Sequence, residues 1–240
     1  MARPAEPRRS LLPHARERWP DLSSAIDDAE DSVVRCAALA DEWRATRLPA
    51  AIPLTARGDS LSARLVVYTV LNLERGVDVA AGAVRGIDAD RVFSAGLCVR
   101  ALLELAAQAS WVAHQVGSAL AAKQVNLRRL DRVTSEALVG VSGDIGDVRR
   151  PAAQPVAKLL RRGEVAFGPA YAEDYRVLSA LAHPTGSLFW RDDPDGASRS
   201  SISPENAERL LRGLSQGLAY LSEPSQELMD LAERTDLTLP

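Results

Sequence analysis

Cysteine is scarce in this chain of 240 residues, which contains only Cys36 and Cys98. Both lie in apolar runs, VVRCAALA and AGLCVRALLEL, and neither belongs to a paired metal-ligand spacing. This pattern excludes zinc-finger and iron–sulfur motifs and is typical of buried thiols in a reducing compartment. A chain of this length buries roughly 70 to 75% of its unfolded surface, enough to form a core without disulfides or a structural metal. We therefore expect no metal site.

Long apolar runs and an excess of basic charge are missing as well. The first residues, MARPAEPRRSLLPHARERWP, lack the apolar core of a signal peptide, and no later stretch reaches about 18 apolar residues. We expect a cytoplasmic protein that does not contact a membrane. The net charge of −3 and the pI near 5.7 do not indicate a surface that binds long duplex DNA. Aromatic residues, at 5%, are too few for an RNA-stacking track.

Alternation of apolar and polar residues, the pattern of β-strands, is not sustained anywhere, whereas several segments repeat apolar residues every three or four positions. The sequence therefore predicts an all-α protein, an up-and-down helical bundle with long central helices. Residues 1–20 hold four prolines among charged residues and are expected to form a flexible arm. Residues 21–235 are expected to form a single helical-bundle domain.

Capping residues, glycines and prolines mark the expected ends of the helices. The predicted helices cover residues 21–47, 60–86, 91–123, 126–141, 170–182 and 204–235, with a short helix after Pro155 and a kink or break at Pro224. The stretch RLPAAIP is expected to stop the first helix. The glycines at 140, 143 and 146 do not open a helix behind a strand, so neither a dinucleotide site nor a P-loop is supported and no cofactor is expected.

The predicted helix 91–123 is apolar around most of its circumference. At about 100° per residue, its polar and aromatic side chains fall within a band of roughly 120°. That band holds Arg100, Glu104, Gln108, Trp111, His114 and Gln115. An apolar arc of about 240° is too wide for a surface helix, so most of this helix should be buried. The polar strip then faces either solvent, with an ordinary Arg100/Glu104 pair, or an internal polar site.

Two of the three histidines, His114 and His183, lie within or at the end of predicted helices. His183 shares one side of its helix with Arg176 and Ser179, because positions seven apart differ by only about 20°. A neutral histidine can take a proton from a ribose hydroxyl while an arginine stabilises the charge on the phosphate. The alternatives are a histidine bound to the last carbonyls of its helix and an Arg176 ion pair, with Glu173 or with an acid of the strip.

If the polar strip of helix 91–123 faces helix 170–182, the polar residues of both helices form one enclosed pocket. Its expected members are Arg100, Glu104, His114, Tyr175, Arg176, Ser179 and His183. Unpaired buried charges are costly, so the members of such a cluster should either pair with one another or bind a ligand.

The segments CVRALLELAAQASW and YRVLSALAHPTG resemble bacterial helical proteins grouped with the HEPN superfamily (higher eukaryotes and prokaryotes nucleotide-binding), over about residues 60–220. The resemblance implies a four-helix bundle that dimerises and presents an Arg, four to six residues, His motif at the dimer interface. Arg176 and His183 match the outer spacing of that motif. It implies a metal-independent endoribonuclease of a toxin or defence system, with His183 as the general base and Arg176 as the phosphate stabiliser.

Other functions stay open on the same residues. The position after the arginine is usually polar in the nuclease members but is Val177 in this chain, and Pro184 directly follows the histidine. Because of these departures, one alternative is a protein that binds a nucleotide, RNA or a partner without cleaving RNA. A structural or interaction module and an unrecognised helical enzyme of specialised metabolism are further alternatives. A serine hydrolase and a di-iron protein fit poorly, because the sequence has neither a GxSxG elbow nor Glu-x-x-His pairs. The apolar excess also predicts a homodimer.

Overall fold

A computed structural model describes residues 10–56, 60–142, 156–182, 202–235 and 237–239. These residues form nine α-helices and one 3-10 helix, so the prediction of an all-α bundle is confirmed. The elements are α1 (Pro13–Arg18), η1 (Pro20–Leu22), α2 (Ser23–Thr46), α3 (Leu48–Ala56), α4 (Leu61–Asp88), α5 (Val92–Leu120), α6 (Leu127–Ser142), α7 (Val156–Phe167), α8 (Pro169–Leu181) and α9 (Pro204–Arg234).

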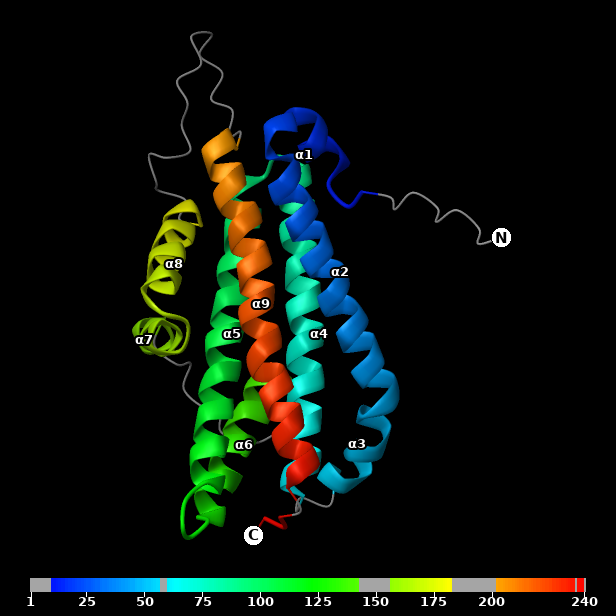
Figure 1. Ribbon diagram of the computed structural model, residues 1–240, viewed down its shortest axis with the longest axis vertical. Coiled ribbons are helices and arrows are strands. Elements are labelled where there is room, and N and C mark those ends of the chain that lie inside the picture. The colour runs from blue at the N-terminus through cyan, green and yellow to red at the C-terminus, as the bar shows by residue number, and fades with distance from the viewer. Residues whose placement is uncertain (1–9, 57–59, 143–155, 183–201, 236, 240) are drawn as a thin grey trace, which may run out of the picture.

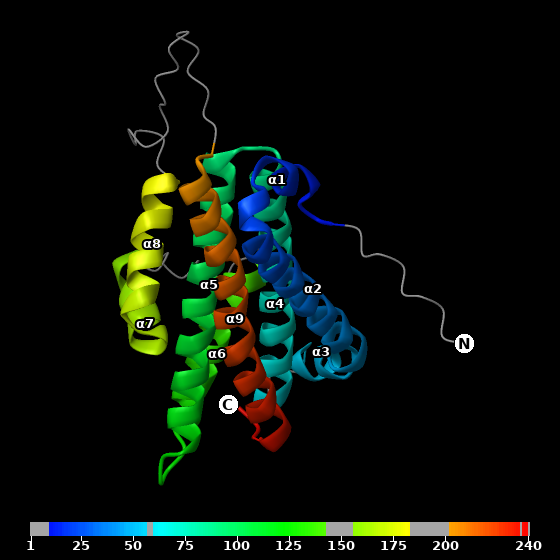
Figure 2. The ribbon, with the colours of Figure 1, turned by 45° about the horizontal axis from the view of Figure 1, so that its top comes forward.

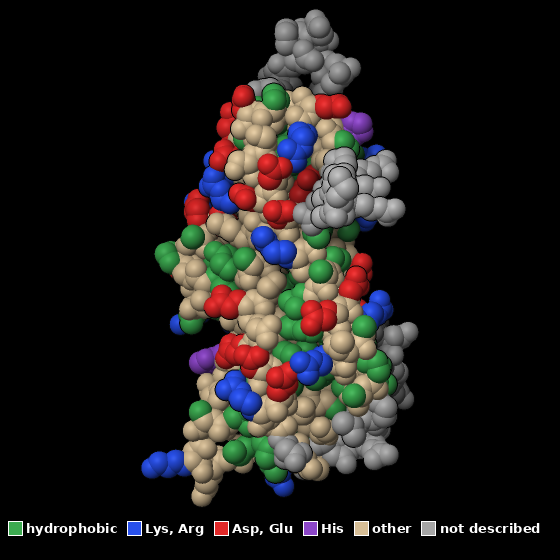
Figure 3. All heavy atoms as spheres, turned by 45° about the vertical axis from the view of Figure 1, so that its right-hand side comes forward, with side chains coloured by type: hydrophobic (Ala, Val, Ile, Leu, Met, Phe, Trp, Pro, Cys, Tyr) green, Lys and Arg blue, Asp and Glu red, His purple; other side chains and the backbone are tan. Residues whose placement is uncertain are grey.

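Four long helices, α2, α4, α5 and α9, lie side by side along the length of the molecule (Figure 1). α7 and α8 lie on the side of α5 that faces away from α4, as both ribbon views show (Figure 2). α6 packs against the lower parts of α4 and α5. On the face turned forward in Figure 3, acidic and basic side chains are interspersed and apolar side chains are scattered in small groups.

α5 is the core helix of the bundle, because it packs against α4, α9, α6, α7 and α8. Thirteen of its residues are buried, and they occupy the apolar arc expected from the sequence. Among the described helices, α5 alone has the length and apolar composition to span a bilayer, but half of its most apolar stretch is buried inside the bundle.

Glycines permit close helix contacts in the core. A Cβ added to Gly76 of α4 would lie 2.2 Å from a Leu221 methyl carbon of α9. A Cβ on Gly86 would lie 2.8 Å from the Ala95 backbone nitrogen of α5. The sequence predicts that α4 ends at Gly86, but the helix continues to Asp88, because this glycine provides room for α5 rather than a helix stop.

The N-terminal segment differs from the predicted flexible arm over residues 10–20; residues 1–9 lie outside the described part. Leu12 and Ala15 are fully buried, and Trp19 is nearly so. Glu30 Oε1 accepts hydrogen bonds from the Leu12 backbone N–H at 2.9 Å and from Ser10 Oγ at 2.5 Å. Three apolar side chains spaced between prolines therefore attach this segment to the bundle.

Prolines stop fewer helices than the sequence suggests. The chain breaks at Arg47 as predicted, but RLPAAIP starts a new helix, α3, with Pro49 in its first turn, where a missing N–H costs no intrahelical bond. α9 continues through Pro224 as one helix. Two of the predicted caps are present: Ser60 and Ser203 accept hydrogen bonds from backbone N–H groups three residues later. The predicted caps at Asp21 and at Asp88 or Asp90 are not formed, because α2 and α5 begin after Leu22 and Arg91 without a side-chain cap.

Candidate functional site

Arg100 and Glu104, one turn apart on α5, meet Tyr175 of α8 in a hydrogen-bonded cluster. Arg100 Nε donates to Glu104 Oε1 at 3.0 Å and to the Tyr175 hydroxyl at 3.0 Å. The Tyr175 hydroxyl in turn donates to Glu104 Oε1 at 2.6 Å. Three of the residues predicted to bind a ligand are therefore brought together, and they hydrogen-bond to one another.

This cluster is stabilised in its ordinary protonation states. Burial, followed by the adjacent Glu104 carboxylate, raises the pKa of Tyr175 to about 12. Burial lowers the pKa of Arg100, but Glu104 and Tyr175 outweigh that effect and the net shift is upward. Only 24% of the Arg100 side chain and 29% of the Glu104 side chain are exposed. The cluster is a self-paired contact between α5 and α8 and offers little to a ligand.

Only one of the two predicted catalytic residues, Arg176, lies in the part of the chain that the structure describes. Arg176 exposes 76% of its side chain and pairs with Glu173, which is one of the partners expected from the sequence. His183 lies outside the described residues. Ser179 has a buried hydroxyl that finds no hydrogen-bond partner among the described residues. Arg176 thus stands at the surface and pairs with Glu173 rather than with the cluster of Arg100, Glu104 and Tyr175.

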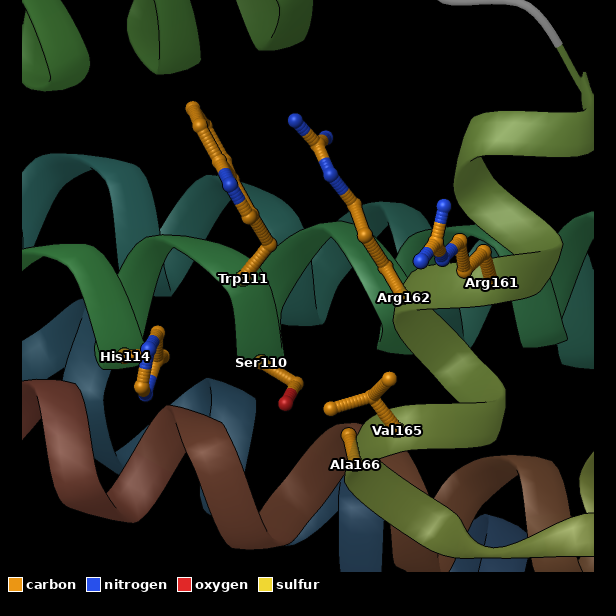
Figure 4. A pocket seen from close by; sticks show the side chains of 7 residues that line it. All are labelled: Ser110, Trp111, His114, Arg161, Arg162, Val165 and Ala166. Atoms are coloured by element: carbon orange, nitrogen blue, oxygen red, sulfur yellow. The ribbon is translucent and has the colours of Figure 1, made fainter.

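His114 lies at a different place, in a pocket of about 510 Å³ between α5 and α7. Its walls are Ser110, Trp111 and His114 from α5 and Arg161, Arg162, Val165 and Ala166 from α7. Trp111 and Arg162 lie side by side and point the same way, whereas Ser110 and His114 lie on the side nearer α9 (Figure 4). The lining surface is mostly apolar. The pocket therefore combines a mostly apolar surface with polar and charged side chains from both helices.

Arg162 is the most unusual side chain of this pocket. Its guanidinium carbon lies 3.9 Å from the centre of the Trp111 ring, which is a close cation–π contact. Its Nη1 is buried and has no hydrogen-bond partner in the part of the chain that the structure describes. Burial lowers the pKa of Arg162, and the negative charge of Glu136 opposes that shift. The guanidinium remains charged at neutral pH, with hydrogen-bonding capacity that the described protein groups leave unused.

Aromatic contacts fix the position of α7 against α5. A Cβ on Gly163 would lie 2.0 Å from the ring of Tyr171, so the tyrosine packs directly on the glycine. The Tyr171 hydroxyl donates to the Leu103 carbonyl of α5 at 2.9 Å. Gly168, with φ of 86°, makes the tight turn from α7 into α8 that glycine favours. These contacts set the separation of the two pocket walls.

Sequence reasoning did not identify Arg161 and Arg162. The segment VAKLLRRGEVAF could have indicated them, because it combines apolar residues at helical spacing with a basic pair. Trp111 and His114 were recognised as members of the polar strip of α5. Nothing local in the sequence indicates that α7 packs against that strip, so the pocket could not be predicted from the sequence.

A second cavity, of about 540 Å³, lies between α2 and α9. Its charged lining consists of Asp21, Asp28, Glu208 and Arg212, and Arg212 donates to Glu208 at 2.5 Å. Among the described residues, no group of three or more histidine, cysteine, aspartate or glutamate side chains is placed to hold a metal ion.

No family model, curated protein or solved structure shows a significant match to this chain. The resemblance to HEPN proteins therefore rests only on the residues described above.

Proposed function

We propose that the protein is a binding protein for a small organic anion, which it holds in the pocket between α5 and α7. The observation that carries this proposal is Arg162, which lines the pocket, stacks on Trp111 and has a buried Nη1 without a hydrogen-bond partner among the described residues. A buried or half-buried cation normally has a charged or hydrogen-bonding partner, because an unpaired one is costly. An anionic ligand supplies that partner.

The pocket supports a small molecule rather than a long polymer. Its volume of about 510 Å³ lies inside the range of about 300 to 1,000 Å³ that is typical of small-molecule sites. Arg161, next to Arg162, adds a second positive charge at the rim. Ser110 and His114 offer hydrogen bonds on the opposite side. Mostly apolar walls with a few convergent polar groups are typical of such sites.

A nucleotide, one of the ligands expected from the sequence, belongs to this class of organic anions. RNA cleavage by Arg176 and His183 stays a prediction from the sequence, and the surface position of Arg176 gives it no support. The homodimer and the HEPN relationship likewise stay predictions. Light scattering at micromolar concentration tests the dimer.

Thermal shift and calorimetry test the proposal. The purified chain is titrated with adenosine monophosphate, benzoate and decanoate, and with neutral adenosine, benzyl alcohol and decanol as matched controls. At least one anion should raise the melting temperature more than its neutral partner. Arg161→Gln combined with Arg162→Gln should abolish that difference, whereas Arg209→Gln, an exposed arginine outside the pocket, should preserve it. If no anion outperforms its neutral partner, the proposal fails.

A further inference from the structure

We infer that the ligand of the α5/α7 pocket is an amphipathic monocarboxylate, with one carboxylate and an apolar body. This inference rests on the proposed function and narrows it to one chemical class. The pocket has a cationic part, formed by Arg161 and Arg162, and an apolar part, formed by Trp111, Val165 and Ala166. A ligand that matches both parts carries its charge at one end only.

The charge in the pocket is suited to a single carboxylate. Arg161 and Arg162 are the permanently charged lining side chains, and Glu136 is near enough to act electrostatically on Arg162. A guanidinium matches the planar geometry of a carboxylate with two parallel hydrogen bonds. Polyphosphates are usually held by successive backbone N–H groups at a helix start or a glycine-rich loop. The lining here comes from the middle and the last turn of helices, where backbone N–H groups are already bonded.

The apolar part of the pocket is exposed in the free protein. Val165 exposes 82% of its surface, the highest value among the large hydrophobic residues that the structure describes. Val165 and Ala166 face the α5 wall across the pocket (Figure 4). Covering this valine with an alkyl or aryl group removes apolar surface from water, which favours binding in proportion to the area buried. A nucleotide places a sugar and a phosphate, both polar, where this apolar surface needs a hydrophobic group.

Isothermal titration calorimetry of the full chain with decanoate, kept below its micelle concentration, tests the inference. Decanoate should bind with one-to-one stoichiometry and more tightly than decanol. Arg162→Met keeps much of the side-chain length but removes the charge, and it should weaken decanoate binding about tenfold or more, the usual effect of losing a charge-assisted hydrogen bond. The same substitution should leave the affinity for decanol unchanged within about twofold.

Two further variants keep the test informative if Arg162→Met lowers stability. Val165→Asp introduces a negative charge into an exposed position of the apolar part and should weaken decanoate binding while the circular dichroism spectrum stays unchanged. Arg209→Met, outside the pocket, should bind decanoate like the parent chain.

The outcomes separate the inference from the proposed function. Tight binding of adenosine monophosphate without binding of decanoate overturns the monocarboxylate inference but leaves the organic-anion proposal standing. Decanoate binding that is equal in the parent chain and in Arg162→Met shows nonspecific hydrophobic association and also overturns the inference. Failure of every anion tested overturns both.

Discussion

The guanidinium of Arg162 on α7 stacks over the indole ring of Trp111 on α5, with 3.9 Å between the guanidinium carbon and the ring centroid. This one contact joins two helices that are separated by more than thirty residues of sequence. It also forms a wall of the α5/α7 pocket. The stability of the helix pair and the chemistry of the pocket are therefore coupled through the same two side chains.

A double-mutant cycle measures this contact. Trp111→Leu and Arg162→Met should show a coupling free energy of about 0.5 to 1 kcal/mol, the usual size for a partly exposed cation–π pair. Urea denaturation followed by circular dichroism gives the free energy of unfolding of the parent, the two single variants and the double variant. Additive effects, with coupling below about 0.3 kcal/mol, would show that the stacking contributes nothing of its own.

Gly163 should be intolerant of a side chain. Gly163→Ala places a methyl group 2.0 Å from the Tyr171 ring, and the resulting overpacking should cost about 1 to 3 kcal/mol of unfolding free energy. Gly117→Ala is the matched control, because it is also helical but its Cβ would meet no atom closer than 3.7 Å. The control should be neutral or stabilising by up to about 1 kcal/mol. Equal melting temperatures for the two variants would contradict the close Gly163–Tyr171 contact.

The four tyrosines should titrate late in the folded protein. Burial raises the pKa of Tyr68, Tyr171, Tyr175 and Tyr220 above the ordinary value of 10.0, and that of Tyr175 reaches about 12. Each raised pKa contributes stability that is fully present below about pH 10, the unfolded value, and is lost as the pH rises through the folded value.

Phenolate absorbance measures this effect. The native chain should ionise at higher pH than the chain unfolded in guanidinium, and Tyr175→Phe should lessen the loss of stability above about pH 10. A native titration that coincides with the unfolded one would refute the assigned burial.

Replacing Asn72 with an apolar residue should stabilise the folded protein. Its side chain is almost fully buried on α4, and neither amide atom has a hydrogen-bond partner among the described residues. Because a buried unsatisfied polar group costs about 1 to 3 kcal/mol, Asn72→Leu should raise the unfolding free energy by an amount of that order. Ser225→Ala serves as the control, since Ser225 Oγ is buried but donates to the Leu221 carbonyl at 2.7 Å. A lower stability of Asn72→Leu would reveal that the amide is bonded in solution.

The nuclease hypothesis from the sequence has a direct test. A binding protein should leave RNA intact at stoichiometric dose, and Arg176→Ala should leave the melting temperature nearly unchanged, because an exposed ion pair contributes little to stability. Cleavage that follows the protein peak in chromatography and disappears in both Arg176→Ala and His183→Ala would instead support the HEPN-like activity.

Helix content and the burial of α5 were predictable because their signals are local and repeat along the chain. Apolar spacing marked the long helices, Ser60 and Ser203 marked two helix starts, and the wide apolar arc of 91–123 marked a core helix. Proline was a weaker signal. Its effect depends on position within a helix, so RLPAAIP opened α3 instead of ending the helical region, and Pro224 lies within α9.

One part of the candidate site was likewise predictable from the local sequence, and another part was not. Arg100 and Glu104 were predicted as a pair from their spacing of four residues, which the geometry of a single helix determines. The approach of Tyr175 to that pair, the position of Arg162 on Trp111 and the opening beside His114 depend on how α7 and α8 pack against α5.

The sequence by itself determined which residues lie on one face of each helix, because that follows from about 3.6 residues per turn. Only the tertiary structure decided which faces meet. Contacts such as the Tyr171 ring on Gly163 join separate helices and depend on the packing of the whole core. For the same reason the N-terminal residues around Leu12 and Ala15 became part of the bundle: both side chains are buried, and the backbone N–H groups of His14 and Ala15 donate to Asp88 Oδ1, more than seventy residues away in the sequence.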